Sequence, residues 1–251
     1  MDLELFNLII DTLIMNGYNI KEIETVKAVI DRKNGKSFCF EDHIAGMVYA
    51  LLSNQRPWKQ ISDNYDLIRD IFHSFNPYYL QNVDPSLFVK EIRNIKCGNR
   101  SINSQMFSLS YNIDIFKKII SIYGSMDSYV TSDDPLIIAN SFASGNFKLK
   151  QMGLPLVLEY LKNVGIDAVK PDTHIRRLFG KDRLSFSDKE LATEKEVLSI
   201  VKELSNMSNL SMVEIDSIIW QFCASNYANI CGSIPKCDKC LLRTRCNYKK
   251  I

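Results

Sequence analysis

Glycine and proline are scarce in this sequence, with 10 and 7 among 251 residues. Apolar residues recur at helical spacing instead, for example at Leu67, Ile68, Ile71 and Phe72. The few breakers leave about ten helical stretches joined by short turns. Because 46% of the residues are hydrophobic, the chain can also bury a sizeable core. The sequence therefore predicts a globular, all-α protein.

Long apolar runs are also missing. None approaches the roughly 18 consecutive apolar residues that a membrane-spanning helix needs. The first ten residues, MDLELFNLII, carry acidic side chains and lack the basic start and the small-residue cleavage site of a secretory signal. We therefore expect a cytoplasmic protein that has no membrane partner.

Net charge is nearly absent, because 31 basic residues face 29 acidic ones and the formal charge is +2. Such a total does not indicate a nucleic-acid partner, since phosphate binding depends on where Lys and Arg lie. Locally, basic residues crowd the last sixteen positions, at Lys236, Lys239, Arg243, Arg245, Lys249 and Lys250. This cluster is either a solvated basic tail or a phosphate-binding surface.

Seven cysteines in a chain without a secretory signal argue against a disulfide framework, because the cytosol keeps thiols reduced. Three are isolated and are expected to be small buried hydrophobes, namely Cys39, Cys97 and Cys223. The other four form the pattern C-x5-C-x2-C-x5-C, at Cys231, Cys237, Cys240 and Cys246.

Four clustered thiolates can hold a structural metal, since soft sulfur ligands select zinc or an iron–sulfur cluster over hard cations. Two CxxC pairs would have favoured zinc. Here a single central pair has a flanking cysteine six positions away on each side, which suits a loop around a larger cubane. We therefore expect a [4Fe-4S] cluster, with zinc as the alternative.

The segment that carries these cysteines, Ile219–Tyr248, resembles the cluster-bearing tail of the endonuclease III family, although five residues rather than six separate the first two cysteines. Upstream, Pro171–Ile175 resembles the family's segment with the catalytic aspartate. The stretch Leu51–Gln55 resembles its buried helix that ends in a DNA-probing glutamine, and residues 153–165 fall where its helix-hairpin-helix lies. The resemblance covers roughly residues 40–250.

This resemblance implies a two-lobed helix-hairpin-helix DNA glycosylase fold. Residues 36–165 would form a six-helix barrel, and residues 1–35 with 166–251 would form the iron–sulfur lobe. Double-stranded DNA with a damaged or modified base would bind in the groove between them. The implied protein is a nucleoid-associated monomer that excises a base in base excision repair.

Asp172 is the residue to which the resemblance assigns catalysis. Breaking an N-glycosidic bond builds positive charge on the deoxyribose, so a fixed carboxylate near C1′ stabilises the oxocarbenium-like transition state. Without the resemblance, Asp172 is simply the N-cap of the next helix, worth about 1 kcal/mol. The two roles are compatible, because helix N–H groups favour a charged carboxylate.

Gln55 matches the family's probe, which fills the space that an extruded nucleotide leaves. Arg56 and Trp58 follow within a turn and could contact the DNA backbone or stack on a base; otherwise they are a polar helix end and a core residue. The turn 98–100 also resembles part of the family fold. Further DNA contacts are assigned to Lys150, Gly153, Arg243 and Arg245.

The hairpin departs from the family pattern of two glycines two residues apart and a lysine two further on. Only Gly153 is kept, and Pro155 stands at the lysine's place. Because that lysine is the nucleophile of the bifunctional members, we expect a monofunctional glycosylase. The alternative is a lyase that uses Lys148 or Lys150, although a surface lysine beside a hairpin is more often a phosphate contact.

Tyr49 stands where the adenine-excising relatives carry a glutamate, so adenine opposite 8-oxoguanine is a poor substrate prediction. Tyr49 and Trp58 are weak candidates for a base pocket, and core packing is the alternative. Two other functions stay open at this point. One is a non-catalytic sensor of DNA lesions, and the other is a zinc-bound structural or regulatory protein.

Overall fold

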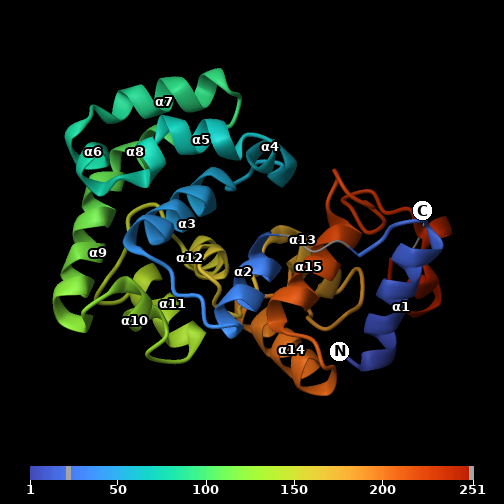
Figure 1. Cartoon of the computed structure of the whole chain (residues 1–251). Coiled ribbons are helices and arrows are strands. Elements are labelled where there is room, and N and C mark those ends of the chain that lie inside the picture. The colour runs from blue at the N-terminus through green and yellow to red at the C-terminus, as the bar shows by residue number, and fades with distance from the viewer. Residues whose placement is uncertain (21–23, 249–251) are drawn as a thin grey trace. The chain divides into compact units, whose positions relative to one another are not determined.

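The computed structural model of the chain describes residues 1–20 and 24–248. Within these residues all regular structure is helical, with fifteen α-helices and three short 3-10 helices (Figure 1). This confirms the predicted all-α class. No helix in the described ranges is both long and apolar enough to cross a membrane.

Backbone contacts divide the chain into two units. The terminal unit combines Met1–Lys27 with Val169–Ile251, and the central unit is Ala28–Ala168. Residues 28–35 and 166–168, which the sequence prediction placed in the iron–sulfur lobe, therefore belong with the central unit.

Contacts of α2 (Glu24–Lys33) explain this shift of the boundary. The guanidinium of Arg32 donates two hydrogen bonds to the carbonyl of Val164, from Nε at 3.0 Å and from Nη2 at 2.7 Å. Gly165 has a φ of +76°, and a Cβ there would lie 2.5 Å from the carbonyl oxygen of Ala28. Glycine is therefore required where these two segments meet.

The central unit contains ten further α-helices and one 3-10 helix. They are α3 (Phe40–Leu52), α4 (Trp58–Ser62), α5 (Tyr65–Ile71), η1 (His73–Phe75), α6 (Pro77–Asn82), α7 (Pro85–Asn94), α8 (Ile102–Phe107), α9 (Leu109–Tyr123), α10 (Met126–Val130), α11 (Pro135–Ala143) and α12 (Leu154–Asn163). Helix α3 is buried on most sides, as the sequence predicts, and packs against α12. Gly46 permits this approach, since a Cβ there would lie 3.1 Å from the side chain of Val164.

A buried polar network joins α2, α3, α10 and α12 inside the central unit. Asp127 accepts both outer guanidinium nitrogens of Arg32, at 3.2 and 2.5 Å, and lies 3.4 Å from Nε2 of His43. On the other side of the imidazole, Nδ1 of His43 lies 2.8 Å from the hydroxyl of the fully buried Tyr160. Such a network fixes the relative positions of its four helices because each buried polar group depends on its neighbour.

Several breaks in the sequence become helix starts. Asp84 and Asp134 cap α7 and α11, each followed by proline at the first helical position.

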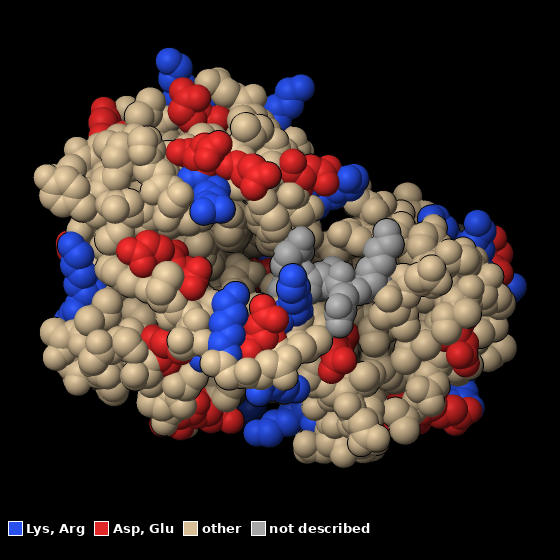
Figure 2. Space-filling view, viewed as in Figure 1, with Lys and Arg blue, Asp and Glu red and all other residues tan. Residues whose placement is uncertain are grey.

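The surface charge is mixed. Figure 2 shows Lys and Arg interspersed with Asp and Glu over the described part of the face in view. This agrees with the small net charge of the sequence.

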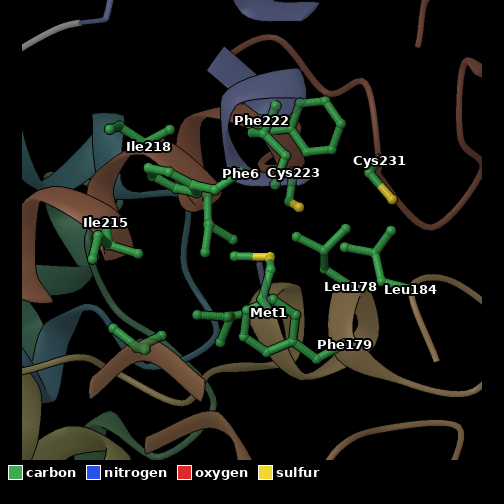
Figure 3. Close-up of a cluster of buried hydrophobic side chains, with 14 of the residues drawn as sticks. Met1, Phe6, Leu178, Phe179, Leu184, Ile215, Ile218, Phe222, Cys223 and Cys231 are labelled. Atoms are coloured by element: carbon green, nitrogen blue, oxygen red, sulfur yellow. The ribbon is translucent and has the colours of Figure 1, made fainter. Parts of the chain in front are cut away.

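The terminal unit contains α1 (Leu3–Met15), α13 (Thr173–Phe179), α14 (Glu194–Met207), α15 (Met212–Cys223), η2 (Cys237–Lys239) and η3 (Leu241–Arg245). Its core is built from α1, α13, α14 and α15, and includes Phe6, Phe179 and Phe222 (Figure 3). The N-terminal helix lies beside the C-terminal segment (Figure 1), where Leu241 N donates to Thr12 Oγ1 at 3.2 Å. This contact explains why residues far apart in sequence form one unit.

The three isolated cysteines do not share one environment. Cys97 and Cys223 are buried, as predicted, but Cys39 is exposed. The prediction for Cys39 was wrong because this residue is the N-cap of α3, at the surface, where the chain enters the helix.

Candidate functional site

Asp172 is the N-cap of α13 in the terminal unit. Its Oδ1 accepts hydrogen bonds from His174 N at 2.8 Å and from Ile175 N at 3.3 Å. The residue before it, Pro171, is buried, whereas Asp172 itself is half-buried. Because both bonds end on Oδ1, they fix the carboxylate without occupying Oδ2. The sequence-predicted cap is therefore present, and its carboxylate remains available for a second role.

The neighbours of Asp172 on α13 are cationic or neutral. Nδ1 of His174 lies 3.3 Å from a guanidinium nitrogen of Arg177. Burial lowers the pKa of His174 despite the nearby carboxylate of Asp172. At neutral pH the imidazole is therefore uncharged, and Arg177 is the cation that contacts it. No sequence pattern indicated this contact, because Arg177 follows His174 in an ordinary helical run.

The four clustered cysteines line one cavity in the same unit. Its walls are Arg183, Ile230, Cys231, Pro235, Cys237, Cys240, Arg243, Cys246 and Tyr248. Cys231 is buried and the other three cysteines are half-buried. The convergence of side chains from a sixteen-residue stretch onto one cavity is what the sequence pattern predicts for a metal loop.

The donor set bears on which group the cavity could hold. Four thiols are soft ligands, which suit zinc or an iron–sulfur cluster better than a hard cation. A tetrahedral zinc site would need all four sulfurs about 2.3 Å from one point. Within the described residues, no three His, Cys, Asp or Glu side chains are placed so that they could hold a metal ion.

Burial dominates the electrostatics of this cavity. It raises the pKa of Cys240 to about 11 and also raises the pKa of Cys246. In contrast, a hydrogen bond with Cys223 lowers the pKa of Cys231, and Arg183 acts in the same direction. Cys223 lies in the apolar core of the unit, with Cys231 at its edge (Figure 3). The thiols thus differ in how readily each loses its proton.

Gln55 and Arg56 lie in the central unit, where they line one open pocket of about 420 Å³ with Asn99 and Arg100. Arg56 reaches across the pocket to the turn before α8, where its Nε donates to the carbonyl of Gly98 at 2.6 Å. Both Gln55 and Arg100 are exposed. The structure therefore brings the two predicted DNA contacts together with two residues for which the sequence had assigned no role.

Gln55 has a left-handed backbone, with a φ of +55°, in the turn that follows α3. For a residue with a Cβ this conformation costs roughly 1–2 kcal/mol, and glycine or asparagine would be favoured there. Strained residues of this kind persist most often at functional sites. The strain supports a role for the Gln55 side chain, which the turn alone does not require.

Tyr49 and Trp58 do not line this pocket. Both pack edge-on against Tyr65, with ring centroids 4.7 and 5.9 Å apart, and Tyr49 also packs against Phe75. Burial raises the pKa of Tyr49 to about 12. These contacts give both residues a packing role in the described structure, which was the alternative to a base pocket.

The hairpin between α11 and α12 has the predicted turn but no lysine at its start. Gly153 is the N-cap of α12, with Pro155 in the first turn of the helix. Lys150 is exposed, and its ammonium lies 4.1 Å from the ring centroid of Tyr111. Its backbone exchanges two hydrogen bonds with the side chain of Asn112. The turn is therefore anchored from α9, and its lysines face solvent.

Only part of the predicted basic tail falls in the described residues, because Lys249 and Lys250 lie outside them. Arg245 forms an ion pair with Glu4, with nitrogen and oxygen 2.6 Å apart. Lys236 donates to the carbonyl of Ala228 at 3.2 Å. Arg243 is exposed and borders the cysteine cavity. Arg245 and Lys236 thus contact other residues of the terminal unit, whereas the sequence predicted that the basic cluster is either solvated or bound to phosphate.

No protein-family model and no curated protein sequence matches the chain. Two solved structures do. The chain is similar to the 8-oxoguanine DNA glycosylase of Methanocaldococcus jannaschii, with a TM-score of 0.60, 17% identity, and 88% of this chain and 96% of that one covered. It is also similar to the 8-oxoguanine glycosylase/lyase of that organism in complex with a 15mer DNA containing 8-oxoguanine. Here the TM-score is 0.57 at 17% identity, and 87% and 96% of the chains are covered. The chain therefore has the all-α fold of the helix-hairpin-helix DNA glycosylases.

Proposed function

We propose that the chain is a DNA glycosylase that hydrolyses the N-glycosidic bond of a damaged, modified or mismatched base in double-stranded DNA. The observation that carries this proposal is the position of Asp172. Its carboxylate is held by two backbone amides at the start of α13, in a fold whose solved neighbours are DNA glycosylases.

The proposed mechanism is electrostatic. As the bond between base and sugar breaks, positive charge develops on the deoxyribose, and the Asp172 carboxylate stabilises it. The amides of His174 and Ile175 hold Oδ1, which leaves Oδ2 to face the sugar or to orient the attacking water. No proton needs to reside on Asp172, so the group works in its ionised form.

We propose that the side chain of Gln55 keeps the duplex open at the damaged nucleotide. Its amide can donate and accept, so it can pair with the base left behind when the damaged nucleotide is extruded. The guanidinium of Arg100, which lines the same pocket, would add a cation for phosphate or for a base edge. Lys150 and the N-terminus of α12 at Gly153 would add contacts to the backbone.

A monofunctional enzyme is part of the proposal. One of the solved neighbours is a glycosylase/lyase, and lyase chemistry needs a desolvated amine aimed at C1′. In this chain Pro155 occupies the hairpin position, and the nearby Lys148 and Lys150 are exposed. Neither exposed lysine supplies such a desolvated amine, which supports hydrolysis without strand cleavage.

We further propose that Cys231, Cys237, Cys240 and Cys246 hold a [4Fe-4S] cluster. The support is the shared cavity, which all four thiols line. The cluster would supply structural stability to the C-terminal loop, in which η2 and η3 are short and most residues lack regular structure. A brown protein is expected, whereas a zinc protein would be colourless.

Incubation with a panel of damaged oligonucleotides tests the proposed activity. The panel contains uracil, a thymine mismatch, 8-oxoguanine, alkylated adenine and an oxidised pyrimidine, each in duplex DNA. We expect one of them to yield abasic sites that are cut only after alkali. Binding of damaged DNA without abasic sites would instead indicate a lesion sensor, and borohydride trapping of a covalent adduct would indicate a lyase.

A further inference from the structure

Arg183 is the most deeply buried charged residue beside the cysteine cavity. It follows α13 in the turn that leads to α14, it is only 5% exposed, and it lines the cavity together with the four cysteines. Its Nε has no hydrogen-bond partner among the described residues. A buried guanidinium that is only partly satisfied is costly, because neither water nor a counter-charge compensates it.

Two contacts of Arg183 lead to the end of the cysteine segment. Its Cζ lies 4.0 Å from the ring centroid of Tyr248, which covers it from one side. Its own carbonyl accepts a hydrogen bond from Asn247 N at 2.7 Å. Arg183 therefore contacts Asn247 and Tyr248, the two residues that follow Cys246, and it lines the cavity beside all four cysteines.

No carboxylate forms a salt bridge with Arg183 in the described residues. One nitrogen, Nη1, donates to the carbonyl of Asp182 at 3.1 Å, which satisfies one hydrogen without neutralising the charge. Four cysteine thiolates around a metal centre would carry the negative charge that this position lacks. The chemistry of the site thus matches a buried cation to an anionic cluster.

We propose that Arg183 is the positioning residue that compensates the charge of the metal centre. It also holds the end of the cysteine segment in place through Asn247 and Tyr248. The proposal rests on the metal site proposed above and goes beyond the four ligands. The ring of Tyr248 keeps water from the guanidinium, so its charge acts on the cluster with little screening. Outer partners of metal ligands commonly control both affinity and potential.

The test compares Arg183→Gln with Arg183→Lys in the full-length, iron-loaded protein. Both variants shorten the side chain, but only Lys keeps the charge. We expect Arg183→Gln to release iron to a chelator about 10- to 100-fold faster than the wild type, as for other outer partners of metal ligands, and Lys to recover part of this deficit. In Arg183→Gln, the reduction potential of the iron that remains should fall, because removal of a cation disfavours the more negative reduced state.

Arg176→Gln is the matched control. Arg176 is half-buried on α13 and its Nε donates to Ala192 O at 2.7 Å, but it does not line the cavity. Its removal should leave iron release and potential unchanged. Equal iron release and equal potentials in Arg183→Gln and Arg183→Lys would overturn the proposal, since the charge would then have no effect.

A second variant covers the case in which Arg183→Gln does not fold. Tyr248→Leu keeps the arginine but lets water reach it, so the potential should shift in the same direction by a smaller amount. An unchanged potential in that variant would also overturn the proposal. Iron content of the wild type is read first, because a colourless or zinc-bound protein would refute the cluster itself. Base release is assayed separately, since its absence with iron retained concerns Asp172 and leaves the Arg183 inference standing.

Discussion

The terminal and central units hold their candidate functional residues in opposite ways. In the terminal unit, backbone amides fix Asp172, and a cavity with a buried arginine collects the four cysteines. In the central unit, Gln55 and Arg100 are exposed around an open pocket, and Gln55 is held in a strained turn. The difference teaches that the proposed catalytic group is fixed by the backbone, whereas the side chain of the proposed DNA probe is exposed to solvent.

The largest expected effect removes the fixed charge. Asp172→Asn keeps the helix cap, because asparagine caps as well as aspartate, but it removes the anion that we propose stabilises the transition state. Base release should fall by at least about 100- to 1,000-fold, while DNA affinity stays within a few-fold. Single-turnover excision and a binding titration measure the two quantities.

Asp84→Asn is the control for this experiment, since Asp84 caps α7 in the central unit in the same way. It should leave excision unchanged. If Asp172→Asn retained full activity, the fixed carboxylate would be a helix cap only, and the two units would no longer differ in chemical role.

The second effect concerns the metal loop. Cys237→Ser removes one of the four thiols that line the cavity and should release iron and lower the melting temperature of the terminal unit. Cys39→Ser, at an exposed cap in the central unit, should leave the iron content unchanged. Iron per chain and thermal unfolding provide the readout. Equal iron depletion in the two variants would contradict the assignment of the ligands.

The stability of the central unit should also depend on a buried charge. Burial alone would raise the pKa of Asp127, but His43 and Arg32 hold it well below its usual range. The carboxylate therefore stabilises the folded state above about pH 4, its unfolded pKa, and this contribution is lost as the pH falls through the folded pKa. Asp127→Asn should lower the free energy of unfolding by about 3 kcal/mol at pH 7.

Denaturant unfolding at pH 7 and at pH 3 checks this prediction, and the difference between wild type and variant should shrink at the lower pH. Asp63→Asn is the control, because Asp63 pairs with Lys59 at the surface of the same unit. Its effect should stay below about 0.5 kcal/mol. A destabilisation at pH 7 no larger than that of the control would mean that the network adds no stability.

The sequence was most informative where a motif is continuous. The segment from Pro171 to Ile175 and the cysteine run each lie within one short stretch, so spacing alone predicted a cap and a shared cavity. The fold class followed from helical periodicity in the same way. Arg183 was missed because its role depends on a contact with Tyr248, 65 positions later, and on burial that no local pattern reveals.

The pocket of the central unit shows the same limit. Gln55 was found through its resemblance to a family probe, but Asn99 and Arg100 join it only because the turn before α8 folds back onto the end of α3. Tyr49, on α3, and Trp58, on α4, are near Gln55 in sequence, yet both pack against Tyr65. Proximity in sequence does not decide which side chains line the pocket, because the fold brings Asn99 and Arg100 there instead.

The strain at Gln55 allows its effect on function to be separated from its effect on stability. Gln55→Gly and Gln55→Ala both remove the amide, but only glycine relieves the left-handed backbone. The free energy of unfolding of Gln55→Gly should therefore exceed that of Gln55→Ala by about 1 kcal/mol, measured by denaturant unfolding. Both should weaken excision to the same extent. If the two variants differed in activity, the backbone of the turn rather than its side chain would be the functional element.

The smallest expected effect concerns the basic tail, where the terminal unit also has exposed cations. Removing one cation that binds a DNA phosphate should lower the slope of log affinity against log salt by about one unit. Arg243→Gln should approach this value, whereas Arg245→Gln should fall short of it, because Glu4 already pairs with Arg245 at 2.6 Å. Glu4→Gln should then raise the slope by releasing the cation. Binding isotherms of damaged duplex between low and moderate salt supply the data. An Arg243→Gln variant with the wild-type slope would mean that this part of the tail is only solvated, and that phosphate is bound by other parts of the chain.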